Sequence, residues 1–368
     1  MSIWSCPACL RWANHPREKA NRDARVGFKD RVASLRRRHW LLRRRYRLLW
    51  RAFRSRRVLS PVSLKTDRIA ARDILVFTTL RNELARLPYF LDYYRSKGVA
   101  HFLMVDNGST DGSRAYLAAQ PDVSLWSTTA GYKQARFGMD WLMWLLRKYG
   151  HDHWCLTVDP DEFLVYPFCD TRSLRALTDW LDGHEAESFP AMLLDMYPKG
   201  PVGAHPCVSG EDPFKTARWF DAGNYMISMN TRFGNLWIQG GPRARVFFAD
   251  NPMAAPALNK IPLVRWRRRF AYVSSTHMLL PRRLNRVYDE DGGERISGLL
   301  LHAKFLATIG DKVAEELGRG QHYADSREYY AYSQAGGTTP DLWCPTSQEY
   351  INWRQLEILG LMSKGDWA

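Results

Sequence analysis

Between residues 72 and 165 the chain alternates short, nearly continuous apolar runs with longer segments in which apolar residues recur at helical spacing. The apolar runs predict buried strands at 74–78, 100–105, 123–126 and 154–158. The clearest segments between them, 82–96 and 134–149, are predicted to be helices. A repeated strand–helix–strand order favours an α/β fold, in which a largely parallel sheet is covered by helices on both faces.

After residue 165 the pattern weakens, because aromatic residues and proline and glycine breaks become frequent. We expect strands at 192–195, 246–248 and 270–274, and either a strand or the start of a helix at 298–306. Ser60 and Pro61 have the character of a linker. The chain is therefore divided into a leader at 1–60, a first half at 61–170 and a second half at 171–368.

The leader carries an apolar stripe on a segment that is otherwise rich in arginine. Leu42, Tyr46, Leu49, Trp50 and Phe53 recur at helical spacing, which predicts an amphipathic helix with a basic face. Such a helix can bind an anionic membrane surface through residues 36–57, or it can pack its stripe on the rest of the protein. Both interpretations stay open. An RNA-binding arm is a weaker third, since no nucleic-acid-binding module follows it, and no nucleic-acid partner is expected.

The net charge of +15 belongs to this leader rather than to the whole chain. Residues 1–60 contain 18 basic and 3 acidic residues, so the remainder carries 35 of each. No apolar run approaches the roughly 20 residues that span a bilayer, and the N-terminus lacks a signal-peptide core. We therefore expect a cytoplasmic protein, peripheral on the inner face of the membrane if the leader binds lipid.

The six cysteines are too scattered to form a disulfide framework, which favours a reducing compartment. Cys6 and Cys9 have the spacing of half a zinc site, but no second pair follows them.

Three polar motifs each follow a predicted strand: R-N-E at 81–83, D-N-G-S-T-D-G at 106–112 and D-P-D-E at 159–162. The carboxyl ends of parallel strands lie at one edge of a sheet, where ligands collect, so we expect the motifs to lie together. Asp159 and Asp161 offer two carboxylates two residues apart, and Mg²⁺ and Mn²⁺ prefer oxygen ligands that they share with substrate phosphates. Each motif alone also fits an ordinary turn or helix cap.

Taken in order, and with Phe163 and Leu164 extending the third motif, this set resembles the family 2 type glycosyltransferases of GT-A fold. The resemblance is closest to their bacterial subgroup with a D-x-D-E-F signature and covers about residues 72–168. It implies a GT-A type, Rossmann-like fold with a basic N-terminal helical extension. It also implies transfer of a sugar from a nucleotide-diphosphate sugar, a UDP-sugar first, to a glycan or lipid-linked acceptor in bacterial surface polysaccharide synthesis.

The resemblance assigns donor binding to 61–170 and acceptor binding to 171–368, which would end in helices. It implies that Asp159 and Asp161 bind Mn²⁺ or Mg²⁺ on the diphosphate, where the metal offsets charge on the departing nucleotide. The residues that it places near the donor are Asn82, Glu83, Asp106, Asn107, Lys133 and Arg136. A solvated helix start explains Lys133 and Arg136 equally well.

In such enzymes a residue from the second half often completes the metal site. His302 is the first candidate and His277 the rival, although a lone histidine in an apolar run is more often a core residue. An inverting transfer also needs a carboxylate as general base, and Asp195 is the first candidate, before Asp250 and Glu294. The family's usual second-half acidic pair is not recognisable, so the base and the stereochemistry stay open.

Two other classes of protein share some of these features. A nucleotidyltransferase also combines a nucleotide-binding sheet with a metal ion, but it should show a glycine-rich, lysine-containing loop near the first strand, and none is visible. A non-catalytic protein could bind membrane or RNA through the leader alone.

Overall fold

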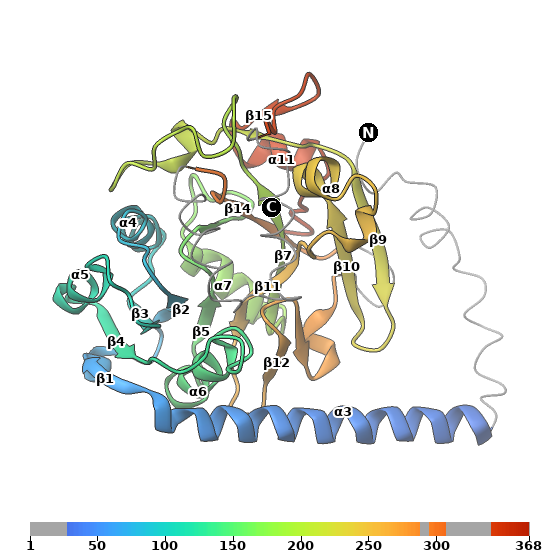
Figure 1. Cartoon of the computed structure of the whole chain (residues 1–368). Helices are drawn as coiled ribbons and strands as arrows, with labels where there is room; N and C mark the ends of the chain where they lie inside the picture. The colour runs from blue at the N-terminus through green and yellow to red at the C-terminus, as the bar shows by residue number, and fades with distance from the viewer. Residues whose placement is uncertain (1–27, 288–293, 307–339, 368) are drawn as a thin grey trace.

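The computed structural model describes residues 28–287, 294–306 and 340–367; at 28–32 it describes the backbone alone. Cys6 and Cys9 lie outside this part of the chain. The described residues form a nine-stranded sheet in the order β1-β4-β3-β2-β5-β11-β7-β14-β6 (Figure 1). The strands are β1 (Ser60–Ser63), β2 (Ile74–Leu80), β3 (His101–Asp106), β4 (Val123–Ser127), β5 (Trp154–Thr157), β6 (Glu162–Val165), β7 (Ser188–Asp195), β11 (Asn259–Arg265) and β14 (Gly298–His302).

The sheet is mixed, but most of its strands point the same way. β4, β3, β2 and β5 pair in parallel, and β7 and β14 form a second parallel pair. β11 lies between these two groups and is antiparallel to both of its neighbours, while β1 and β6 form antiparallel edges. β11 therefore joins strands of the first and second halves into one sheet.

Helices cover both faces of the sheet. Ile74 and Val76 of β2 belong to one buried core, which also holds residues of α4 (Leu87–Ser96) and α7 (Leu174–Gly183). Leu75 and Phe77 face the opposite core, which includes α6 (Met139–Tyr149). Successive strand residues point to opposite faces, so a strand buried on both sides reads as a continuous apolar run. The prediction of an α/β fold with a largely parallel sheet flanked by helices is thus confirmed.

The strands predicted in the first half are confirmed, but two helices begin later than predicted. α4 starts at Leu87 rather than 82, and Asn82 has a left-handed backbone with φ 51°. α6 starts at Met139 rather than 134, because Arg136, Phe137 and Gly138 all have positive φ. A helix cannot continue through left-handed residues, so both segments before the helices are loops at the edge of the sheet.

The second half confirms three predicted elements and corrects one. Residues 192–195 end β7, 270–274 correspond to β12 (Ala271–Ser274), and 298–306 begins with β14. The strand predicted at 246–248 is wrong, because Gly241 and Pro242 open a short helix, α8 (Gly241–Phe247), which suits proline in its first turn. The remaining elements are α5 (Ser113–Ala119), β8 (Trp219–Phe220), β9 (Tyr225–Asn230), β10 (Asn235–Gly240), β13 (Met278–Leu280), β15 (Gln348–Glu349) and α11 (Trp353–Ile358).

Most of the described part of the leader forms one long helix, α3 (Phe28–Ser55), that runs along the side of the molecule beside α6 (Figure 1). Leu48, Leu49 and Ala52 belong to the same core as α6, and Arg51 Nε donates to Asp140 Oδ2 at 3.0 Å. Of the predicted stripe only Leu49 is buried; the other four members are exposed. The linker predicted at Ser60 and Pro61 is instead edge strand β1, where a proline is tolerated. Among the described residues, no helix is both long and apolar enough to cross a membrane.

Candidate functional site

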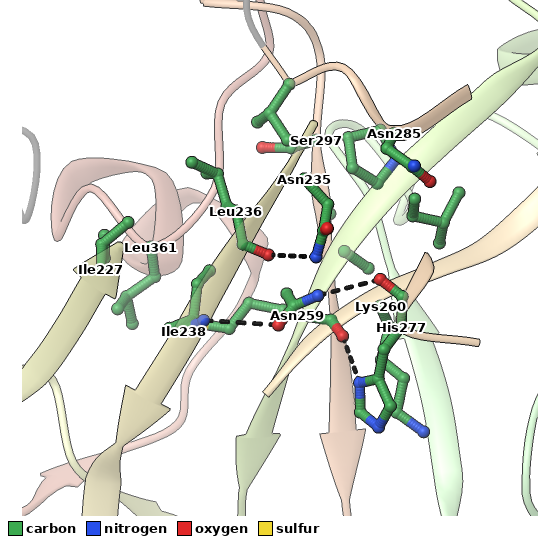
Figure 2. A pocket seen from close by; sticks show the side chains of 16 residues that line it. Ile227, Asn235, Leu236, Ile238, Asn259, Lys260, His277, Asn285, Ser297 and Leu361 are labelled. Atoms are coloured by element: carbon green, nitrogen blue, oxygen red, sulfur yellow. Dashed lines mark hydrogen bonds between the residues drawn. The ribbon is translucent and has the colours of Figure 1, made fainter. Parts of the chain in front are cut away.

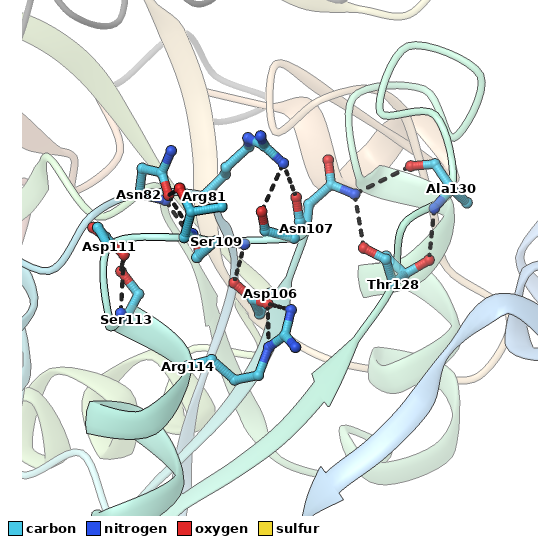
Figure 3. A network of polar contacts seen from close by, with 12 residues as sticks. Arg81, Asn82, Asp106, Asn107, Ser109, Asp111, Ser113, Arg114, Thr128 and Ala130 are labelled. Atoms are coloured by element: carbon cyan, nitrogen blue, oxygen red, sulfur yellow. Dashed lines mark hydrogen bonds and ion pairs between the residues drawn. The ribbon is translucent and has the colours of Figure 1, made fainter.

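The loops after β2 and β3 are fastened to each other at the carboxyl edge of the sheet (Figure 3). Arg81 donates from one guanidinium nitrogen to the carbonyls of Asn107 and Gly108, at 2.9 and 2.8 Å. In return, Asn82 Oδ1 accepts from the backbone N–H of Thr110 at 2.8 Å. The left-handed backbone of Asn82 places its side chain in this bond, which explains why no helix starts there.

The side chains of Asp106 and Asn107 also hold the loop after β3 in place. Asp106 is fully buried; it accepts from the N–H of Ser109 at 3.1 Å and from Arg114 Nε at 2.8 Å. The Asn107 amide donates to the carbonyls of Thr128 and Ala130, both at 3.1 Å. The structure therefore brings Asn82, Asp106 and Asn107 together, as predicted, and uses these side chains to shape the loops. Their contact with a nucleoside stays a prediction.

A buried ion pair fixes the acidic turn after β5. Lys260 Nζ, from β11, lies 2.9 Å from Glu162 Oε1, and both side chains are buried. Glu162 Oε2 accepts from the backbone N–H of Asp159 at 3.2 Å. Burial alone would lower the pKa of Lys260, but the Glu162 and Asp159 charges raise it above its ordinary value. Lys260 thus stays charged and holds Glu162, which in turn holds the D-P-D turn.

Asp161 of this turn faces His302 at the end of β14. His302 Nε2 lies 3.5 Å from Asp161 Oδ2, and the N–H of Ala303 donates to the Asp161 carbonyl at 2.9 Å. Sheet register sets this meeting, because His302 is opposite Glu162 on β6 and beside Asp195 on β7. The carboxylates of Asp161 and Asp195 and the imidazole of His302 therefore converge from three separate segments. The metal-ligand role of Asp161 and His302 stays a prediction.

Asp195 holds the other nitrogen of His302. Its Oδ1 lies 2.7 Å from His302 Nδ1, and its Oδ2 accepts from Arg243 Nε, on α8, at 2.7 Å. An ionised carboxylate only accepts, so the Nδ1 of His302 carries the proton and the Nε2 lone pair is available in the neutral imidazole. Burial opposes ionisation of Asp195, but Arg243 and then His302 lower its pKa below the ordinary value. Burial likewise opposes charging His302, yet Asp161 and Asp195 raise its pKa.

The donor set of Asp161 and His302 fits a divalent cation in part. Ligand atoms that are each about 2.1 Å from one ion lie about 3.0–3.5 Å apart, which the Nε2 to Oδ2 distance of 3.5 Å satisfies. A carboxylate behind the histidine is also the usual arrangement around metal-bound imidazole. Within the described residues, however, no group of three or more His, Cys, Asp or Glu side chains could hold a metal ion. Further ligands would have to come from substrate, water or movement of Asp159.

Asp159 is open to solvent, although protein atoms surround its carboxylate on most sides. This desolvation, and next the neighbouring Glu162 charge, raise the pKa of Asp159 to about 7. Asp159 thus adds a second carboxylate near Asp161, where a cation would be favoured.

The other predicted residues have different surroundings. Glu83 pairs with Arg86 at 3.0 Å, and Arg86 also donates to the Ala303 carbonyl at 3.3 Å, so this buried pair ties the first motif to the end of β14. Arg136 donates to Asp140 and to the carbonyls of Tyr272 and Val273, whereas Lys133 is exposed. The alternative bases, Asp250 and Glu294, are both exposed.

His277, the rival ligand, belongs to a different place. It lines a small, largely apolar pocket of about 40 Å³ together with Asn235, Asn259 and Asn285 (Figure 2). Its Nδ1 lies 2.6 Å from the Asn259 carbonyl. Burial and then the nearby Lys260 charge lower the pKa of His277 to about 3. His277 is therefore neutral and bonded to backbone, which favours a structural role.

The chain matches no protein-family model and no curated protein. Among solved structures, one similar chain is a putative glucose-1-phosphate thymidylyltransferase from Bacillus anthracis, in complex with a sucrose. The two chains are 9% identical with a TM-score of 0.27, over 79% of this chain and 95% of the other. A similarity at this level carries no argument about function.

Proposed function

We propose that the chain is a metal-dependent glycosyltransferase of GT-A type, which takes a sugar from a nucleotide-diphosphate sugar, a UDP-sugar first, and transfers it to a glycan or lipid-linked acceptor. The observation that supports this most is the approach of Asp161 and His302, 3.5 Å apart and drawn from the two halves of the chain. Both residues follow or end strands at the carboxyl edge, where ligands collect in parallel sheets, and Arg86 of the segment after β2 donates to the Ala303 carbonyl next to His302.

In this proposal Asp161 and His302 hold Mn²⁺ or Mg²⁺, and Asp159 moves to join them when a substrate is bound. A bound ion of this kind offsets the negative charge that develops on a departing nucleoside diphosphate. Asp195 keeps His302 in the tautomer that exposes Nε2, and Arg243 keeps Asp195 ionised. The Lys260–Glu162 pair keeps the D-P-D turn in place.

Asp195 was also the first candidate for the general base. Its side chain is only 1% exposed, and its two oxygens face His302 and Arg243. A general base must lie within hydrogen-bond reach of the acceptor hydroxyl. We therefore propose that Asp195 positions His302 and that another carboxylate serves as base.

The donor is proposed to bind across the fastened loops that contain Asn82, Glu83, Asp106 and Asn107. Because the side chains of these residues shape the loops, backbone groups and the exposed Lys133 are the proposed contacts with the nucleotide. Arg136 supports the turn before α6 through its bonds to Asp140 and to two carbonyls.

The test combines metal binding with turnover. Mn²⁺ binding is followed by electron paramagnetic resonance in the intact protein, in Asp161→Ala and in Asp92→Ala, a control whose side chain is 74% exposed. We expect Asp161→Ala alone to lose Mn²⁺ binding and the release of nucleoside diphosphate from UDP-sugars. Wild-type turnover by Asp161→Ala in the presence of EDTA would contradict the proposal. Release of pyrophosphate from a nucleoside triphosphate and a sugar 1-phosphate would identify a nucleotidyltransferase instead.

A further inference from the structure

α3 has a second apolar stripe, most of which faces away from the protein; its last member, Phe53, also contacts the Trp144 ring of α6, with 5.9 Å between the ring centres. Its members are separated by seven, four, four and three residues, which places them along one side of the helix. Their side chains are exposed to solvent: Leu35 64%, Leu42 37%, Tyr46 64%, Trp50 56% and Phe53 43%. The adjoining side of the helix buries Leu48, Leu49 and Ala52. One helix thus presents one stripe to the core and another to its surroundings.

Arginines border the outward stripe. Residues 36–57 contain 11 arginines, and no acidic residue occurs between Asp30 and Asp67. Some of these cations lie over the aromatic rings: Arg54 is 4.7 Å from the centre of the Trp50 ring, and Arg56 is 3.6 Å from that of Phe53. Apolar rings and aliphatic stems with guanidinium groups at their rim are the composition of a helix that lies in a membrane interface.

We propose that this α3 outer surface, formed by the five exposed apolar residues and the arginines beside them, docks the protein on an anionic lipid bilayer. Charge complementarity identifies the partner as anionic, since every charged side chain on the surface is an arginine. The aliphatic members distinguish lipid from nucleic acid: hydrocarbon chains can bury Leu35 and Leu42, whereas a phosphate backbone offers them nothing.

The docking would hold the whole protein in one orientation. The stripe from Leu35 to Phe53 is about 27 Å long at 1.5 Å per residue, so α3 lies parallel to the bilayer plane. Arg51 and Ser55 bond to Asp140, and Arg51 also reaches the Gln134 carbonyl, so the helix is fastened to α6 and its preceding turn. This proposal does not depend on the proposed activity and can fail or succeed separately.

The experiment uses the full-length protein and vesicle flotation. Vesicles of phosphatidylcholine with roughly one-third phosphatidylglycerol are compared with pure phosphatidylcholine, at about 0.1 M and about 0.5 M NaCl. We expect binding to the anionic vesicles at low salt, and much weaker binding in each of the other conditions.

Two pairs of variants separate the apolar from the charged contribution. The double variant Tyr46→Ser, Trp50→Ser should weaken vesicle binding about tenfold or more. Its control, Ile351→Ser with Ile358→Ser, also removes two exposed apolar side chains and should leave binding unchanged. The double variant Arg43→Gln, Arg47→Gln should weaken vesicle binding about 25-fold, because each lost charge costs about fivefold. Its control, Lys199→Gln with Lys215→Gln, removes two exposed charges elsewhere and should leave binding unchanged. Thermal unfolding would check that all four variants are folded.

Three results would overturn the proposal. The first is equal binding of the helix variants and their controls. The second is binding of single-stranded RNA that depends on Arg43 and Arg47 when no vesicle binding is detected. The third is a dimer in sedimentation experiments that dissociates in the Tyr46 and Trp50 variant, since a second copy would then cover the surface.

Discussion

The Nδ1 of His302 is bonded to Asp195, which leaves Nε2 for the proposed metal ion. The metal affinity of the proposed site should therefore depend on Asp195. Replacing Asp195 by Asn keeps the shape but removes the charge that fixes the Nδ1–H tautomer. We expect Asp195→Asn to weaken Mn²⁺ binding by about 10- to 100-fold, the usual cost of losing such a partner. Isothermal titration measures this affinity.

A matched double variant separates positioning from stability. Asp195→Asn also leaves the buried Arg243 without its carboxylate partner, which should cost about 3–5 kcal/mol of unfolding free energy. Adding Arg243→Met should restore most of that stability in urea denaturation, but not the Mn²⁺ affinity. If affinity returns together with stability, Asp195 has no specific positioning role.

The Lys260–Glu162 pair makes a similar prediction for the acidic turn. Both groups are buried, so Lys260→Met leaves an uncompensated carboxylate and should lower the unfolding free energy by about 3–5 kcal/mol. Glu162→Gln in the same chain should recover most of the loss in urea denaturation. A Lys260→Met protein as stable as the wild type would show that the pair contributes little to the turn.

His277 predicts how stability depends on pH. Its pKa of about 3 in the folded protein lies below the ordinary value of 6.5, so protonation favours unfolding. Its contribution is fully present above pH 6.5 and is lost as the pH falls from there towards 3, by at most about 1.4 kcal/mol per pH unit. His277→Gln should therefore flatten the decline in unfolding free energy between pH 6.5 and 5. An unchanged slope would contradict the assignment.

At this scale the sequence identified some groups and missed others for a physical reason. Asp161 and His302 stand in recognisable local settings, a strand end and an apolar run. Arg243 has no local signal and Lys260 has only a weak one, because their partners, Asp195 and Glu162, are distant in the sequence. The weak signal of Lys260 is a charged residue next to the apolar residues of β11.

Among the elements, α3 is attached to the domain by charge as well as by apolar packing. Asp140 forms ion pairs with both Arg51 of α3 and Arg136 of the turn before α6. Asp140→Ala should remove the carboxylate that both cations share. We expect it to lower the unfolding free energy by about 1–3 kcal/mol and to increase hydrogen exchange in 44–55. Asp179→Ala, which removes an exposed pair with Arg72, is the control and should cost under about 1 kcal/mol. Equal exchange in the two variants would show that packing alone holds α3.

The elements that sequence predicted best are those whose signal is continuous and local. β2, β3, β4 and β5 are buried on both faces, so they read as apolar runs with clear ends. The late starts of α4 and α6 were missed, because apolar spacing continues through residues such as Phe137 whose backbone is left-handed. β11 was missed as well, since Pro262 and Lys260 interrupt a strand that is held by neighbours on both sides.

For the whole molecule, the order of elements in the first half predicted an α/β sheet, but not how the second half would complete it. β7, β11 and β14 lie in the sheet next to β5 and β6, so strands from 188–302 are inserted between strands from 154–165. Such pairings are set by burial and register over long sequence separations, which local patterns do not report. The acceptor-side prediction was weakest for this reason.

β14 aligns His302 with Asp195 on one side and with Glu162 on the other. One residue inserted between Gly298 and His302 would turn the imidazole to the opposite face of the sheet, even if every neighbouring helix stayed in place. The proposed cation site should therefore tolerate changes in the length of the second-half loops, but not a change in the number of residues along β14. We expect divergent relatives to keep this number even where their overall identity is low.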